Sequence, residues 1–325
     1  MSVKYVSNPA LPIIKKGWVG NPVRGRSFIN EKPAQISMIN FVKSRLNNPQ
    51  RKERKNDPYR AGFCPNDDFM KSDEDMIVWL GHASFFIRLG GVTFLTDPSY
   101  YSFPTRNRLV PIPCDVENFK FVDYVLISHM HHDHADTRSI RKIFKGNKKT
   151  QALLPLNGGN YVKYFTKNYQ EAGWYQQYQT MPGVEVYFLP SFHWSRMHVF
   201  DSNRTLWGSF IIRGNGKTIY FGGDTAWGTH FETISELFPD IDYAILPIGA
   251  YTPRSVAEYA HISPEEAVDA AKVLNAKHLV PMHFGTYPLG QEPLGEPYRK
   301  ICRLDEDGEI SGCLNCLDVG EELLI

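Results

Sequence analysis

Long apolar segments are absent from this chain of 325 residues. A membrane-spanning helix needs about 18 consecutive apolar residues, and no stretch of the sequence approaches that length. Residues 1–9 also lack the apolar core of about 7–15 residues that a secretory signal contains. We therefore expect a cytoplasmic protein without a membrane-spanning segment, unless a leader was removed before Met1.

Cysteine is scarce and irregularly spaced, with five residues in the whole chain. An odd number without a repeating pattern argues against a disulfide framework and is typical of a reducing compartment. Cys313 and Cys316 form one C-x-x-C pair, but a zinc knuckle needs a second pair nearby and the sequence has none. We expect idle or buried thiols rather than a metal or redox site.

Net charge is also low, at +1, yet its distribution is uneven. Residues 1–60 contain 13 lysines and arginines against three acids, so the remainder of the chain is acidic. Such a basic segment can bind nucleic acid, an anionic membrane surface, or the acidic body of its own protein. No aromatic-interleaved motif accompanies it, so we do not expect nucleic acid as a partner. An apolar stripe over 38–46 favours peripheral membrane contact through residues 38–60, as the alternative to packing on the body.

The sequence divides near residue 75. Residues 1–75 are rich in proline, asparagine and basic side chains, and a helical pattern at Gln35–Leu46 predicts a basic N-terminal arm with a short amphipathic helix. Residues 76–325 form the second unit, in which β-branched and aromatic runs predict strands. These runs are 76–80, 84–89, 92–96, 122–127, 184–189, 205–213, 217–221, 243–246 and 278–280.

Turn and helix signals lie between these runs. Gly90-Gly91 predicts a hairpin between two of the strands. Ser263 is followed by Pro264 and, three residues on, by Glu266, which together predict a capped helix start. Strands with interspersed helices favour a layered α/β sandwich.

Histidine is concentrated at one point of the sequence. Of eleven histidines, four lie in the six residues from His129 to His134, together with Asp133. The cluster follows an apolar strand, which places it on a loop at the carboxyl end of that strand, where α/β proteins build their sites. Imidazole and carboxylate donors suit zinc, and also iron or manganese, and no thiolate is present to close a structural site.

Three further candidates have the same placement at strand ends. His193 follows the run 184–190, Asp224 follows 218–221 and a pair of glycines, and His283 follows 278–281. The glycine pair before Asp224 allows close approach of the backbone. We expect these three side chains to converge with the histidine cluster on one rim of the sandwich.

The motif His129-x-His131-x-Asp133-His134, followed by a lone histidine, an aspartate and a final histidine, resembles the metallo-β-lactamase superfamily. The segments around Gly81-His82-Ala83, Gly223-Asp224-Thr225 and His283-Phe-Gly285-Thr are more specific. They resemble N-acylphosphatidylethanolamine-hydrolysing phospholipase D and its bacterial relatives, and more distantly the ascorbate-6-phosphate lactonases. The resemblance implies a four-layer αββα sandwich over residues 76–325.

The resemblance also implies a site with two divalent metal ions, most often zinc, that share a bridging hydroxide. The metal ligands it implies are His129, His131 and His193 for one ion, Asp133, His134 and His283 for the other, and Asp224 between them.

Catalytic and substrate-binding roles follow from the same comparison. Asp133 would orient the nucleophile, and His261 matches a histidine that holds the substrate phosphate or transfers a proton. Tyr251 and Arg254 lie between Asp224 and His261 in the sequence, and we expect them to assist anion binding. His82 and Asp97 are interpreted as buried support or turn residues.

Three functions remain in view. The first is a zinc phosphodiesterase of phospholipase D type that cleaves N-acylphosphatidylethanolamine-like lipids, with a homodimer as the form the resemblance implies. The second is a lactonase or phosphoesterase acting on a small phosphorylated metabolite. The third is a metal-binding scaffold without turnover, which predicts a site closed to solvent by protein ligands, whereas catalysis needs an open position on the metal.

Overall fold

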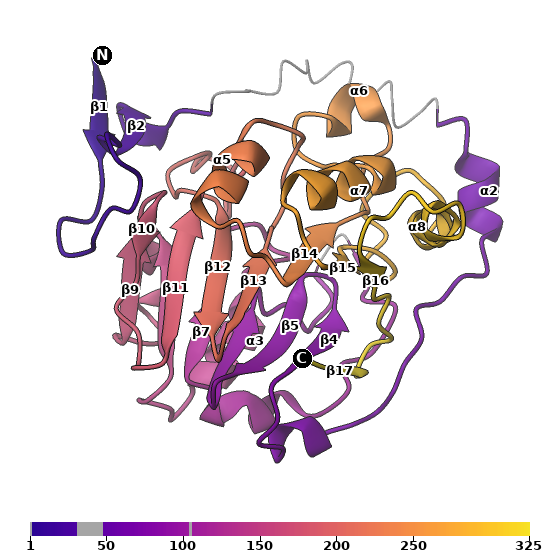
Figure 1. Cartoon of the computed structure of the whole chain (residues 1–325), viewed down its shortest axis with the longest axis horizontal. Coiled ribbons are helices and arrows are strands. Elements are labelled where there is room, and N and C mark those ends of the chain that lie inside the picture. The colour runs from indigo at the N-terminus through magenta and orange to yellow at the C-terminus, as the bar shows by residue number, and fades with distance from the viewer. Residues whose placement is uncertain (1, 31–47, 104–105) are drawn as a thin grey trace.

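Two seven-stranded β-sheets lie face to face, and helices cover their outer faces (Figure 1). The computed structural model describes residues 2–30, 48–103 and 106–325. This arrangement confirms the predicted α/β sandwich with four αββα layers. None of the helices in these residues is long and apolar enough to cross a membrane.

The first sheet has the strand order β17-β4-β5-β6-β7-β8-β9. Pairs from β17 to β6 are antiparallel, and pairs from β6 to β9 are parallel. The predicted hairpin at Gly90-Gly91 joins two of its strands. The strands are β4 (Met76–Gly81), β5 (Ser84–Leu89), β6 (Val92–Thr96), β7 (Tyr124–Leu126), β8 (Gln151–Pro155), β9 (Tyr169–Ala172) and β17 (Glu322–Leu324).

The second sheet repeats this pairing pattern in the order β10 to β16, with three antiparallel pairs followed by three parallel pairs. Its strands are β10 (Gln176–Gln177), β11 (Val184–Leu189), β12 (Ser209–Gly214), β13 (Lys217–Phe221), β14 (Tyr243–Pro247), β15 (His278–Met282) and β16 (Cys313–Leu314). Because β11, β13 and β15 run in the same direction, their carboxyl ends lie at one edge of the sheet.

Both faces of the central strands are buried, as β4 illustrates. Ile77 and Trp79 pack in the core between the sheets, whereas Val78 and Leu80 pack under the outer helices. Side chains alternate along a strand, so a strand covered on both faces is apolar at every position. This explains the continuous apolar runs that marked the strands in the sequence.

Helices and turns form the outer layers. Ile140 and Ile143 of α3 belong to the same core cluster as Val78 of the first sheet, and Phe231 of α5 and Ala267 of α7 pack with the second. The helices are α2 (Arg51–Asn56), α3 (Thr137–Phe144), α4 (Gly159–Val162), α5 (His230–Leu237), α6 (Arg254–Ala257), α7 (Pro264–Val273) and α8 (Glu296–Glu306), with 3₁₀ turns at Asp68–Met70 and Val116–Phe121.

The predicted helix start at Ser263 is confirmed as a complete capping box. The Glu266 amide donates to Ser263 Oγ at 3.3 Å, and the Ser263 amide donates to Glu266 Oε2 at 2.8 Å. Two of the amide groups at the start of α7 are thereby satisfied. The capping residue Ser263 follows His261 by two positions, so this cap also fixes the segment that carries His261.

The N-terminal residues form a small antiparallel sheet of β1 (Val3–Val6), β2 (Asn21–Arg24) and β3 (Ser27–Phe28). The Gln176 side chain donates to the Asn8 carbonyl at 2.7 Å, and Leu11 and Phe28 are buried in the core. Among the described residues, no lysine or arginine between positions 2 and 60 lies within 4.0 Å of a carboxylate. Within the described residues, the basic side chains of this segment therefore make no ion pairs. The segment packs on the body through hydrogen bonds, apolar contacts and the pair of Asp57 with Arg299 at 2.8 Å.

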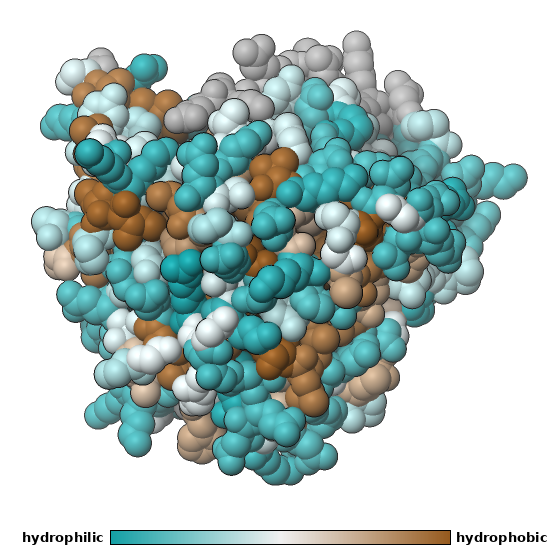
Figure 2. Space-filling view, viewed as in Figure 1, coloured by the Kyte–Doolittle hydropathy of each residue, from teal (hydrophilic) through white to brown (hydrophobic). Residues whose placement is uncertain are grey.

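Exposed apolar side chains remain on this small sheet, where hydrophobic atoms gather at the upper left of the space-filling view (Figure 2). Tyr5 and Val19 are among them. The predicted amphipathic helix Gln35–Leu46 lies outside the described residues. All five cysteines are free thiols.

Candidate active site

The histidine cluster lies on the turn that joins β7 to α3. The turn is closed by hydrogen bonds from the amides of His134 and Ala135 to the His131 carbonyl, at 3.1 and 2.8 Å. The Asp136 carboxylate then caps the start of α3 by accepting from the Arg138 and Ser139 amides. The sequence between a buried strand and a capped helix is thus held in a tight turn that presents successive side chains to one rim.

The three distant candidates reach the same rim from the second sheet. His193, Asp224 and His283 follow the carboxyl ends of β11, β13 and β15. Gly223 has φ +57°, and a Cβ atom there would lie 2.9 Å from both the Gly208 carbonyl oxygen and Ser128 Cβ. Only glycine allows this approach without strain, so it brings Asp224 against the histidine turn.

One set of donors comprises His129, His131, His193 and Asp224. His129 Nε2 lies 2.8 Å from His131 Nδ1, and His193 Nε2 lies 3.1 Å from the same nitrogen. The Asp224 Oδ2 atom completes the set at 3.8 Å from His129 Nε2 and 3.6 Å from His193 Nε2. We call these four residues the imidazole set.

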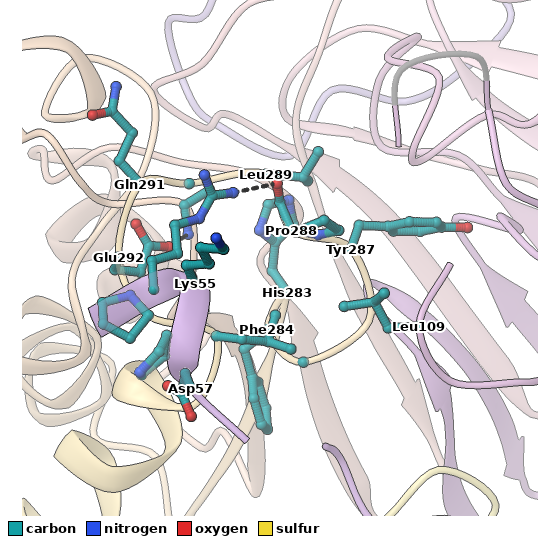
Figure 3. Close-up of a pocket in the computed structure, with 18 of the residues that line it drawn as sticks. Lys55, Asp57, Leu109, His283, Phe284, Tyr287, Pro288, Leu289, Gln291 and Glu292 are labelled. Carbon is teal, nitrogen blue, oxygen red and sulfur yellow. Dashed lines mark hydrogen bonds between the residues drawn. The ribbon is translucent and has the colours of Figure 1, made fainter. Parts of the chain in front are cut away.

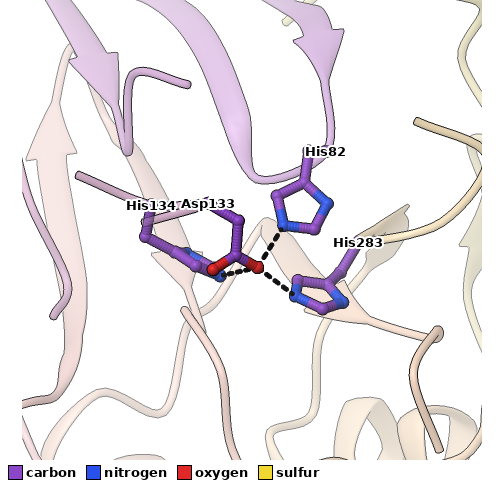
Figure 4. A group of neighbouring side chains, drawn as sticks. All are labelled: His82, Asp133, His134 and His283. Carbon is purple, nitrogen blue, oxygen red and sulfur yellow. Dashed lines mark hydrogen bonds and ion pairs between the residues drawn. The ribbon is translucent and has the colours of Figure 1, made fainter. Parts of the chain in front are cut away.

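A second set comprises His82, Asp133, His134 and His283 (Figure 4). Asp133 Oδ2 lies 3.0 Å from His82 Nε2, 3.6 Å from His134 Nε2 and 3.7 Å from His283 Nε2. We call these four residues the carboxylate set. The two sets meet at Asp224, whose oxygens lie 3.2 Å from His134 Nε2 and 3.1 Å from His283 Nε2.

Charge differs between the two sets. Burial lowers the pKa of His131 to about 4 and holds the pKa values of His129 and His193 well below the ordinary range. These rings are therefore neutral at physiological pH. A neutral imidazole has a nitrogen lone pair available, which is the form that binds a metal ion.

In the carboxylate set, burial disfavours charge but the opposite charges outweigh it. The carboxylates of Asp224 and Asp133 raise the pKa of His283 to about 9 and raise the pKa of His134 well above its usual value. The His134 charge in turn is the largest factor that holds the pKa of both carboxyl groups well below the ordinary range. Without a metal ion, this half of the site is a buried ionic network.

Several donor atoms at the centre have no hydrogen-bond partner among the described residues. They are His134 Nε2, His283 Nε2, Asp224 Oδ1 and His261 Nδ1, all buried. Buried polar atoms are almost always paired, so a cluster of unpaired ones indicates a missing ligand. Imidazole nitrogens and carboxylates that face one centre fit divalent metal ions, which would displace the protons of His134 and His283.

Residues behind the ligands fix their tautomers. His134 Nδ1 donates to Asp97 Oδ2 at 2.7 Å, and Ser128 Oγ donates to the same oxygen at 2.6 Å. Ser128 Oγ therefore accepts from His129 Nδ1, 2.9 Å away. On the other side, His193 Nδ1 donates to the Ala260 carbonyl at 2.9 Å. Each bond leaves Nε2 directed at the centre, as metal-binding histidines require, and His134 must first release the proton that it carries in the metal-free site.

His82 and Asp97 were interpreted from the sequence only as buried support or turn residues. The structure places His82 in direct contact with Asp133, and Asp97 in contact with His134. His82 adopts a left-handed backbone with φ +59°, which non-glycine residues rarely adopt and which often marks a functional site. The Gly81-His82-Ala83 segment at a predicted strand end was the available signal.

Of the residues expected to bind substrate, His261 lies at the centre, where its Nδ1 atom is 3.9 Å from Asp224 Oδ2 and its side chain is partly exposed. The Tyr251 hydroxyl donates to Glu296 of α8. Arg254 donates to Glu266 at 2.7 Å and to the His261 carbonyl at 3.0 Å, so it holds the segment that carries His261. A role for Tyr251 and Arg254 in anion binding stays a prediction.

Comparisons with known proteins agree with this geometry. Residues 93–284 match the family model described as Beta-lactamase superfamily domain. The chain is 31% identical over 255 residues to N-acyl-phosphatidylethanolamine-hydrolyzing phospholipase D 1 of Caenorhabditis elegans, covering 73% of this chain and 72% of the relative. It is 33% identical over 228 residues to a UPF0173 metal-dependent hydrolase of Pyrococcus abyssi, covering 69% of this chain and 91% of the relative.

A solved structure shows the same fold. Igni18, a metallo hydrolase from Ignicoccus hospitalis, superposes with a TM-score of 0.58 at 24% identity, covering 77% of this chain and 98% of that one. The chain therefore belongs to the β-lactamase superfamily, among its metal-dependent hydrolases. Every residue from His129 to His283 of the two donor sets lies within the matched segment.

Proposed function

We propose that this protein is a phosphodiesterase of phospholipase D type that hydrolyses N-acylphosphatidylethanolamine-like lipids. The observation that carries the proposal is the pair of donor sets that share Asp224, a layout suited to two metal ions about 3.5–4 Å apart that act on a phosphodiester. The similarity to a relative that is named for this activity supports the choice of substrate.

The proposal assigns two divalent metal ions to the site, with zinc first and manganese or iron as substitutes. The imidazole set would hold one ion, while Asp133, His134 and His283 would hold the other, with Asp224 shared. Such ions, when bound, act as Lewis acids and lower the pKa of water toward 7. His82 would support Asp133 from outside, because its Nε2 atom donates to the carboxylate.

The chain's own side chains would divide the remaining work. Asp133, held by His82, would accept a hydrogen bond from the attacking water and orient it. His261 is the partly exposed histidine of the centre, and burial lowers its pKa to about 4. A largely neutral ring at this position would pass a proton to the leaving alkoxide once it had taken one from solvent or water.

The proposal extends to how a lipid substrate is reached. In the described part of the basic segment, residues 48–60, the α2 side chains of Lys52 and Lys55 are exposed. Exposed lysines are attracted to anionic lipids, so we propose peripheral contact with an anionic membrane through this region. Vesicle binding that weakens as salt concentration rises, and that is lost on deletion of residues 1–60, is the expected result. A homodimer is proposed as the solution form, which light scattering would measure.

The function is tested by incubating the zinc-loaded protein with mixed micelles of N-acylphosphatidylethanolamine. Water adds across the phosphorus–oxygen bond, so phosphatidic acid and N-acylethanolamine are expected in equal amounts, and ¹⁸O from labelled water is expected in the phosphatidic acid. His131→Ala should abolish the release, while His198→Ala, outside both donor sets, should retain it. Turnover of soluble lactones or phosphate esters without lipid turnover would favour the small-metabolite hydrolase instead.

A further inference from the structure

A pocket of about 620 Å³ lies beside the carboxylate set, between α2 and the loop that follows β15 (Figure 3). One wall is made by the basic residues Arg51, Arg54, Lys55 and Arg60. The opposite wall is the loop from His283 to Pro297. Of the residues in the two donor sets, His283 alone lines this pocket.

The cations of this wall have no acidic partners in the part of the chain that the structure describes. Among the described residues, no carboxylate lies within 4.0 Å of the charged groups of Arg51, Arg54, Lys55 or Arg60. Arg54 donates to the Pro288 carbonyl at 3.0 Å, and both residues line the pocket, so this bond fixes the guanidinium at the pocket wall. Four positive charges therefore line one pocket, and no carboxylate of the described residues neutralises them.

The two acids that also line the pocket already have partners. Asp57 pairs with Arg299 at 2.8 Å and accepts from the Gly295 amide at 3.0 Å. Glu292 is buried and accepts from the amides of Ala250 and Thr252, at 2.6 and 3.1 Å. Neither carboxylate is placed to neutralise the basic wall, so the pocket keeps an excess of positive charge.

Uncompensated like charges around a cleft repel one another, and the low-dielectric walls concentrate their field on the hollow. A bound anion would remove this repulsion and gain charge-assisted hydrogen bonds, for which the guanidinium groups offer paired donors. Leu109, Phe284 and Tyr287 give the remaining wall apolar surface, which suits the organic part of an ester. A phosphate monoester carries both features.

We propose that this pocket is a second anion site that binds a glycerol-phosphate-type monoester, either as a free molecule or as the headgroup of a lipid. His283 is the one member of the two donor sets that lines it, so the occupant would rest against the loop that carries this residue. The proposal goes beyond the proposed function, because it requires binding without turnover.

The test is calorimetric titration of the full-length, metal-loaded protein with glycerol 3-phosphate, and sedimentation with phosphatidylcholine vesicles that contain phosphatidic acid. The variant Arg51→Gln/Lys55→Gln should weaken binding by about tenfold or more, since it removes two charged hydrogen-bond donors. Lys52→Gln is the matched control, because Lys52 is an exposed cation of the same helix that does not line the pocket. It should change binding by less than about twofold.

The outcomes separate the sources of the anion. If glycerol 3-phosphate binds, and binds more weakly to Arg51→Gln/Lys55→Gln but not to Lys52→Gln, the occupant is a free ester. If only the vesicles bind with these differences between variants, the occupant is a lipid headgroup. Equal binding by the wild type, Arg51→Gln/Lys55→Gln and Lys52→Gln would overturn the proposal. Binding that is lost in His131→Ala but kept in Arg51→Gln/Lys55→Gln would place the anion at the metal centre and overturn it too. Absence of binding to both probes would overturn it as well. Hydrolysis is not measured, so failure here leaves the proposed function standing.

Discussion

The two donor sets of the site share one carboxylate but are built on opposite electrostatic principles. In the imidazole set, burial holds the rings neutral, and their outer nitrogens are fixed by the Ser128 hydroxyl and the Ala260 carbonyl. In the carboxylate set, His134 and His283 are charged partners of Asp133 and Asp224. The imidazole set can therefore bind a metal ion without losing protons, whereas the carboxylate set must release protons when a metal ion binds.

Both sets draw on the β7–α3 turn, but each adds its own elements of the fold. The imidazole set adds the loops after β11 and β13, with neutral hydrogen bonds behind it. The carboxylate set adds the β4–β5 turn and the end of β15, and an ionic network holds it in place. Variants that damage one half and spare the other measure how independent they are.

The largest effect is expected from Asp224→Ala, because this residue belongs to both halves. Removing one partner from a buried charged network costs about 3–5 kcal/mol, which corresponds to about 10²–10⁴-fold in metal affinity. Metal analysis should show that both equivalents are weakened and that activity falls with them. Asp242→Asn is the control, because Asp242 precedes the amino end of β14, away from the site, where it bonds Thr218 and Lys277. Loss of a single equivalent in Asp224→Ala would refute the shared role.

A smaller and one-sided effect is expected from His82→Phe. This change removes the hydrogen bond to Asp133, and loss of such a supporting bond typically costs about 10–100-fold in metal affinity. Titration against a chromophoric chelator should show weakening of one equivalent, that of the carboxylate set. His82→Gln, which keeps a donor near the same position, should restore most of the affinity. If Gln and Phe behave alike, the ring acts through packing alone.

The metal-free protein should be most stable near pH 6.5 and lose stability in both directions. Burial lowers the pKa of folded His131 to about 4. As the pH drops from 6.5 to 4, this histidine therefore binds a proton in the unfolded chain but not in the folded one, and stability falls. Above pH 6.5, folded His283 keeps its proton up to pH 9 while the unfolded chain loses it, so stability falls again.

Thermal unfolding of the chelator-treated protein from pH 4 to 9 measures the loss of stability on the acid and on the alkaline side. His131→Gln should reduce the loss on the acid side, and His283→Gln should reduce the loss on the alkaline side. His198→Gln, outside both sets, serves as control. A loss on the alkaline side that is unchanged in His283→Gln would show that the ionic network is not formed without metal.

The smallest effect is expected from Ser263→Ala. Loss of the N-cap hydrogen bond to Glu266 should lower the free energy of unfolding by about 1 kcal/mol. Urea unfolding measures the change, and metal affinity should stay as in the wild type because the cap touches neither donor set. A fall in affinity comparable to that of His82→Phe would show that the His261 segment supports the metals more directly.

The metal-ligand candidates could be read from the sequence because each follows an apolar strand directly, and parallel strands bring such positions to one edge. Among the strands of the two large sheets, β8, β9, β10, β16 and β17 escaped prediction, and the first two show why. β8 is a short apolar run that ends in Pro155, a pattern shared by buried helices and strands. β9 is a partly exposed strand of polar residues, and only its pairing with β8 makes it a strand.

Contacts between residues far apart in the sequence are the other part of the site that could not be predicted. Tyr251 and Arg254 lie near the site in sequence, but Glu296 and Glu266 take up their polar groups. The support given by His82 depends on Asp133, 51 residues further on. Spacing identifies residues that leave the same strand end, but it does not reveal which charged groups meet across a fold.

The position of β17 bears on the order in which the first sheet is completed. Glu322–Leu324 pair antiparallel with Val78, Ile77 and Met76 of β4, so the two partners lie at opposite ends of the sandwich sequence. Until residues 322–324 have been synthesised, one edge of β4 stays unpaired and apolar, and such an edge is a template for aggregation. The same strand leads into the turn that carries His82. The first sheet, with the strand that positions His82, is therefore completed only after the rest of the sandwich has been synthesised.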